Sequence, residues 1–156
     1  MARLPREASR RMRSAARFYA VQALFQMEAQ GTPLDEAIRE FETFRIGAEI
    51  DGEVYEEADI DHFRTLVREA VSRQAAIDQL TDRALVAKWP IDRIDPTLRA
   101  LFRAAGAELV ATPTPPKVVI TEFVDVAKAF FPKGKEPKFV NAVLDHMARE
   151  ARPDLA

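Results

Sequence analysis

Two groups of basic side chains could bind phosphate, and the larger group lies at the start of the chain. Residues 1–17 hold six arginines against one glutamate, Glu7. The arginines are Arg3, Arg6, Arg10, Arg11, Arg13 and Arg17. A guanidinium group is planar, binds phosphate oxygens in pairs and stays charged. This segment therefore has the electrostatic character of a nucleic-acid contact, although a solvated basic terminus explains the same residues equally well.

The spacing of these arginines predicts how they are presented. Arg13 and Arg17 are four positions apart, so on a helix they project from the same face. Arg10 and Arg11 precede that face, and we expect them to form a mobile arm. A basic arm that continues into a helix could hold the phosphates of a nucleic acid.

The second basic group contains Lys133, Lys135 and Lys138, and Phe139 follows it directly. Lysines beside an aromatic ring could hold an RNA backbone and stack an unpaired base. The alternative is that the lysines belong to an ordinary loop and that Phe139 is a core residue. The apolar residues that follow at helical spacing favour the core interpretation for Phe139 taken alone.

Acidic residues gather between Leu34 and His62, where eleven carboxylates face two arginines, a net charge of −9 with histidine neutral. This segment should repel nucleic acid, so a path for RNA must avoid it. An ordinary solvated surface is the simpler interpretation. The formal charge of the whole chain is only −2, so the distribution of charge, not its total, indicates a nucleic-acid partner.

Residues for metal binding or catalysis are missing from the sequence. It has no cysteine, which excludes disulfides and thiolate metal sites, and no glycine-rich phosphate loop. His62 and His146 have no partner at ligand spacing. Asp61 beside His62, and Glu122 with Asp125, are interpreted as exposed polar pairs. We therefore predict no catalytic residue, no metal, no cofactor and no enzymatic activity.

The apolar residues recur at helical spacing and predict an all-α fold of six or seven helices. Gly31 is expected to end the first helix in a left-handed conformation, and Asp95-Pro96 is a typical helix start. The β-branched residues 118–120 permit a strand, but the longer pattern favours a helix. The expected helical ranges are 14–30, 34–44, 59–88 with a break near Ser72, 96–109, 117–131 and 136–149.

The remaining segments are predicted to be loops, and Pro90 is expected to divide the chain. We expect an acidic loop over 45–58 and proline-containing loops over 112–116 and 132–137. Residues 1–89, with the arginine-rich arm, and 90–156 are predicted to be two halves of one domain, with Trp89 packed at their joint. Hydrophobic residues make up 47% of the chain, but no apolar run is long enough for a bilayer. We therefore expect a soluble, cytoplasmic protein without a secretory signal.

Four segments resemble the NusB family of transcription antitermination factors. The arginine-rich run 10–17 leads into Ala-Val-Gln-Ala-Leu-Phe at 20–25, and the range 99–109 resembles the family's central Arg-x-x-x-Arg helix that ends in Glu-Leu. The ranges 116–128 and 138–145 resemble its last two helices. These matches cover nearly the whole chain in the family's order.

The resemblance implies two stacked three-helix bundles and binding of single-stranded boxA RNA in nascent transcripts. It implies two partners, the small-subunit ribosomal protein NusE and the elongating RNA polymerase complex. The family's RNA contacts fall here on Arg10, Arg11, Arg13, Arg17, Lys135, Lys138 and Phe139. Three positions depart from the family pattern: Ala107 stands where many relatives have tyrosine, Lys135 where many are acidic or small, and Pro116 where some present an aromatic residue.

Two other functions remain open at this point. The chain could be the NusB-like RNA-recognition domain of a ribosomal RNA cytosine methyltransferase, which would make it a fragment because no cofactor-binding α/β domain follows. It could also be a protein–protein adaptor that does not bind RNA. A homodimer is possible, because some helical proteins of this size bury a face between two copies.

Overall fold

The computed structural model describes residues 6–47, 49–50, 53–54, 57–85 and 93–155, which form seven helices and one two-stranded hairpin. The elements are α1 (Arg6–Gln30), α2 (Leu34–Phe44), β1 (Glu49–Ile50), β2 (Glu53–Val54), α3 (Ile60–Ser72), α4 (Gln74–Ala84), α5 (Pro96–Ala111), α6 (Pro116–Phe130) and α7 (Glu136–Ala151). The all-α prediction is confirmed. None of the described helices is both long and apolar enough to cross a membrane.

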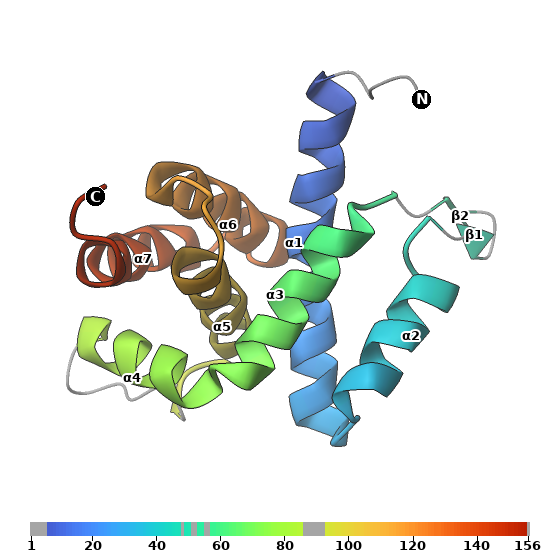
Figure 1. Ribbon diagram of the computed structural model, residues 1–156, viewed down its shortest axis with the longest axis horizontal. Helices are drawn as coiled ribbons and strands as arrows, with labels where there is room; N and C mark the ends of the chain where they lie inside the picture. Colours follow the sequence, from blue (N-terminus) through green and yellow to red (C-terminus); the bar gives the residue numbers. More distant parts are fainter. Residues whose placement is uncertain (1–5, 48, 51–52, 55–56, 86–92, 156) are drawn as a thin grey trace.

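The helices form two groups, which pack against each other mainly through α1 of the first group and α5 of the second (Figure 1). The first group contains α1, α2 and α3, and the second contains α4, α5, α6 and α7. In Figure 1, α2 lies on the side of α1 opposite α6 and α7. The most extensive contacts of α1 are with α3 of its own group and α5 of the other. The apolar side chains of both groups therefore belong to one continuous core.

The division predicted at Pro90 stays a prediction, because Trp89 and Pro90 lie outside the described residues. Helix α4 precedes that point in the sequence, yet it packs mainly on α5 and α7. The contact between α4 and α5 is close at Gly106, where an added Cβ would lie 2.4 Å from Cγ2 of Ile77. A side chain at Gly106 would therefore force α4 and α5 apart.

Single residues in the sequence correctly predicted where several helices begin or end. Gly31 has φ of +68° and its amide donates to the Met27 carbonyl at 2.9 Å, so it ends α1 in the predicted left-handed conformation. The Asp95 carboxylate accepts the Thr97 amide at 2.7 Å, with Pro96 opening α5 as predicted. The break near Ser72 is confirmed.

Three predictions about the elements are wrong. Helix α1 begins at Arg6, not at residue 14, so Arg10 and Arg11 are helical and do not form a mobile arm. Arg, Glu, Ala and Met are good helix formers, and Glu7 in the first turn favours the helix dipole. Helix α4 ends at Ala84, four residues before the predicted end. The segment 45–58 contains a short antiparallel hairpin, in which Ile50 is paired with Glu53, and is not only a loop.

Candidate nucleic-acid interface

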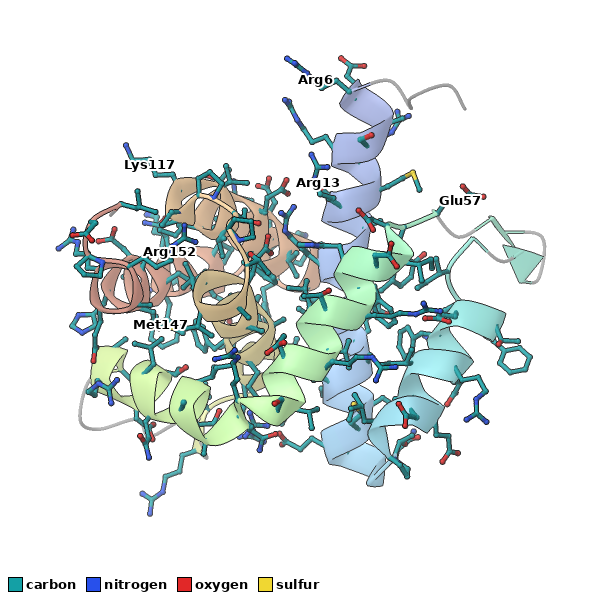
Figure 2. All side chains as sticks on the ribbon, in the orientation of Figure 1. Arg6, Arg13, Glu57, Lys117, Met147 and Arg152 are labelled. Carbon is teal, nitrogen blue, oxygen red and sulfur yellow. The ribbon has the colours of Figure 1, made fainter. Side chains whose placement is uncertain are left out.

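The amino-terminal part of α1 extends beyond the other helices and carries the predicted arginines (Figures 1 and 2). Arg10, Arg11 and Arg13 are exposed. Within the described residues, none of their three side chains makes an ion pair or a hydrogen bond. No carboxylate of the described residues therefore pairs with their charge, which is available to an anion.

Arg17, one turn after Arg13, is buried with an exposed fraction of only 2%. Its Nε and Nη2 atoms donate to the two carboxylate oxygens of Glu108, each at 2.8 Å. Its Nη1 lies 3.1 Å from Oε1 of Glu122. The expectation that Arg17 projects toward solvent beside Arg13 is wrong, because two carboxylates hold its guanidinium inside the protein.

Ser14 and His62 complete this buried network. The Ser14 hydroxyl lies 3.0 Å and 2.9 Å from the two oxygens of Glu122 and donates to that carboxylate. His62 Nε2 lies 3.2 Å from Oε2 of Glu108, and the His62 side chain is 13% exposed. Glu122 and His62 were interpreted as exposed polar residues, and both interpretations are wrong. The network joins α1, α3, α5 and α6 at one point.

Opposite charges keep Glu108 and Arg17 ionised within this network. Burial raises the pKa of the Glu108 carboxyl, but the hydrogen bonds and charge of Arg17, together with the neighbouring His62, outweigh burial and lower this pKa to about 2. Burial also lowers the pKa of Arg17, whereas the hydrogen bond and charge of Glu108 raise it, with a net increase. A buried charge without such partners would be far less stable.

A depression of about 400 Å³ separates the exposed arginines from the loop that precedes α6. Its lining residues are Arg10, Arg13, Arg17, Pro113, Thr114, Pro115, Val118 and Glu122. Val118 is 41% exposed, which makes it one of the few large apolar side chains open to solvent among the described residues. Nothing in the sequence pointed to the loop or to Val118 as part of a site, because only the packing of α6 beside α1 brings them to the arginines.

The predicted lysines lie at the other end of α6. Lys133, Lys135 and Lys138 are exposed around the turn between α6 and α7. Phe139 is partly buried and meets the ring of Phe102 edge-on, with 6.0 Å between the ring centroids. The arginines line a depression at the start of α6, so the two basic groups are separated by the length of a 15-residue helix, roughly 22 Å. They do not form one patch.

Among the described acidic residues, those of α2 lie on the other side of α1 from α6 and α7 (Figure 1), whereas Asp59 and Asp61 line depressions beside Arg13. Exposed arginines of α3 neutralise part of the charge of α2, since Arg64 pairs with Glu42 at 2.5 Å and Arg68 with Asp35 at 3.4 Å. Helix α2 carries much of the negative charge and lies away from α6 and α7 (Figure 1). The lysine end of α6 is therefore separated from the acidic helix by α1.

Comparisons with known proteins agree on one family. A family model described as the NusB family matches residues 14–149. Transcription antitermination protein NusB of Maricaulis maris is 48% identical over 151 residues, covering 96% of this chain and 94% of the relative. The protein of the same name from Brucella abortus is 47% identical over 146 residues, covering 93% and 84%.

Solved structures agree with this result. NusB of T. maritima superimposes with a TM-score of 0.73 at 27% identity, covering 98% of this chain and 97% of that one. A crystal structure of the antitermination factors NusB and NusE in complex with double-stranded RNA contains a chain with a TM-score of 0.68 at 26% identity, covering 90% of this chain and 98% of that one.

Proposed function

This chain belongs to the NusB family, and we propose that it binds single-stranded boxA-type RNA of ribosomal RNA transcripts together with the ribosomal protein NusE. Its relatives are transcription antitermination proteins, which confirms the resemblance noted in the sequence and the prediction of a non-enzymatic protein. In this proposal the chain is an adaptor that joins RNA to the elongating RNA polymerase complex in the cytoplasm.

The observation that carries this proposal is the row of arginines without ion-pair partners on α1. Arg10, Arg11 and Arg13 are exposed near the amino-terminal end of α1, and no carboxylate of the described residues pairs with them. Phosphate binding by such residues releases counterions from the nucleic acid and makes the affinity depend strongly on salt. We propose these three residues as phosphate contacts.

The separation of the two basic groups supports a linear ligand. A strand that contacts Arg10 and Arg13 at one end of α6 must follow that helix to reach Lys135 and Lys138 at the other end. An extended single strand can do so while leaving its bases free for side chains to read. Phe139 lies beside the lysines with its ring partly buried, so any contact it makes with a base uses the exposed part of the ring.

Arg17 has a different role in this proposal from the one its position in the sequence suggested. All three nitrogens of its guanidinium contact Glu108 or Glu122, so it positions α1 against α5 and α6 instead of contacting phosphate. The orientation of Arg13, one turn away, depends on that anchoring.

Fluorescence anisotropy with a short boxA-like RNA and a scrambled control, with and without NusE and at two salt concentrations, tests this function. Arg13→Ala should weaken binding and reduce the slope of log K against log salt by about 1. Arg39→Ala is the matched control, because Arg39 is an exposed arginine of the acidic helix α2. Equal binding of the two RNAs in every condition, or equal effects of the two variants, would contradict the proposal and leave a helical adaptor for another partner.

A further inference from the structure

We infer that the depression between α1 and the loop before α6 is a base subsite, which takes one unpaired nucleobase bearing an exocyclic amine. The Glu122 carboxylate is the group that accepts this amine. The inference rests on the proposed RNA binding and adds the class of base that is preferred. Three observations support it: the shape of the depression, the unpaired arginines at its edge and the carboxylate within it.

The walls of the depression suit the two faces of a base. Pro113, Pro115 and Val118 give an apolar wall, and Val118 is 41% exposed. Arg10 and Arg13 line the same depression from α1. Unpaired RNA bases stack on apolar and guanidinium surfaces of this kind. The volume of about 400 Å³ falls within the range of small-molecule sites, roughly 300–1,000 Å³, and one nucleotide fits.

Glu122 supplies the hydrogen-bonding group inside the depression. Its side chain is 17% exposed. It accepts a hydrogen bond from the Ser14 hydroxyl and pairs with the Arg17 guanidinium. A carboxylate has about four acceptor positions, so one hydroxyl and one guanidinium N–H leave acceptor capacity for a ligand. These two protein donors also fix the orientation of the carboxylate before the ligand arrives, which makes Arg17 and Ser14 positioning residues.

An ionised carboxylate accepts hydrogen bonds and cannot donate them. Cytosine, adenine and guanine each present an exocyclic amine whose N–H can point at Glu122, as glutamate accepts from cytosine N4 in nucleic-acid complexes. Uracil has no amine, and its single N–H lies between two carbonyl oxygens that the carboxylate repels. The depression should therefore favour an amino-bearing base over uracil.

The test compares fluorescently labelled oligo-C and oligo-U of equal length, about ten nucleotides, at one salt concentration. The two are pyrimidines of similar size, and a homopolymer presents the same base in every register. The wild-type protein should bind oligo-C about tenfold more tightly, the effect of one hydrogen bond to a charged group. In Glu122→Gln, whose amide both donates and accepts, the ratio should fall below about twofold with an unchanged salt slope.

Two further variants keep the result interpretable if Glu122→Gln does not fold. Asp125→Asn removes an exposed carboxylate of the same helix that does not line the depression, so the preference for oligo-C should persist. Val118→Arg, at an exposed position four residues before Glu122 on α6, can pair with that carboxylate and occupy its free acceptor positions, so the preference for oligo-C should be lost. Circular dichroism during thermal unfolding checks that each variant is folded.

The possible failures are distinguishable. A ratio near one in the wild-type protein, or an unchanged ratio in folded Glu122→Gln or Val118→Arg, overturns the base subsite. If the base subsite is overturned but Arg13→Ala still weakens RNA binding, the proposed function stands. No RNA binding by the wild-type protein, alone or with NusE, overturns the proposed function and the subsite together.

Discussion

Arg13 and Arg17 lie one turn apart on the same helix, yet their surroundings are opposite. Arg13 is exposed and unpaired among the described residues, whereas Arg17 is 2% exposed and bound by two carboxylates. The cause is the neighbouring helices: α5 and α6 place two carboxylates against Arg17, whereas Arg13 lies one turn nearer the end of α1 that extends beyond the other helices (Figure 2). Positions four residues apart share a face of a helix, but the neighbouring helices decide which part of that face is covered.

The comparison separates two uses of arginine on one element. The exposed arginines give charge to a surface and contribute little to folding, because solvent already satisfies them. The buried arginine joins helices that are distant in sequence, and removing it leaves Glu108 as a buried charge with only His62 beside it. Variants of the two groups should therefore change different measured properties.

The largest expected effect is on folding, for Arg17→Ala. Removing one partner of a buried ion pair typically lowers the free energy of unfolding by about 3–5 kcal/mol. Urea denaturation should show this loss for Arg17→Ala, while Arg13→Ala should change the free energy of unfolding by less than about 0.5 kcal/mol. Similar unfolding curves for the two variants would contradict the distinction between them.

The pH dependence of stability should depend on Glu108. Its pKa is about 2 in the folded protein and near 4.5 in the unfolded chain, so folding depresses it. Its contribution, about 3 kcal/mol, is present above pH 4.5 and is lost as pH falls from 4.5 toward 2. Urea midpoints measured across this window should fall more steeply for the wild-type protein than for Glu108→Gln. Parallel pH profiles would rule out Glu108 as the group responsible.

The exposed arginines should matter for RNA alone. In Arg10→Ala/Arg13→Ala, the loss of two phosphate contacts should weaken RNA binding by about 2 kcal/mol and lower the salt slope by about 2. The free energy of unfolding should change by no more than about 0.5 kcal/mol per substitution. Anisotropy and urea denaturation of the same preparations measure both. A large loss of stability would show that these arginines also hold the fold together.

The smallest effect is expected for an arginine that is both exposed and paired. Arg73 lies 2.7 Å from Glu69 on the surface, with its side chain 51% exposed. Arg73→Ala should lower the free energy of unfolding by about 0.3–0.5 kcal/mol and leave RNA affinity unchanged. If its effect on stability approached that of Arg17→Ala, burial would not be the property that separates the two groups.

Much of the fold follows from local signals in the sequence. The bounds of α2 were predicted to the residue, and Gly31 and Asp95 end and begin helices for reasons contained in their own side chains. The hairpin was missed because its strands contain only two residues each, too few for an alternating pattern. The Asp51-Gly52 dipeptide between them is a typical two-residue hairpin turn sequence and was the available signal.

Only those parts of the candidate site that consist of clustered charged residues could be predicted from the sequence. The arginines and lysines were found as clusters of one residue type. The burial of Arg17 was not, because its partner Glu108 lies 91 positions away in the chain. A hint exists in retrospect, since Glu108 is the only acidic residue in the otherwise largely apolar helix α5. The depression depends on how the loop at 113–115 packs beside α1, which no local pattern encodes.

The sharing of α1 between both helical groups also has a consequence for synthesis on the ribosome. Helix α1 is translated first, but the residues of α5 that cover it end about 80 positions later. At about 5–20 residues per second, the apolar side of α1 waits roughly 4–16 s for its partner. During that interval α2 and α3 can cover only part of it. The nascent chain therefore passes through a stage in which an apolar helix surface is open to chaperones or to aggregation, and release from that stage depends on the carboxy-terminal half.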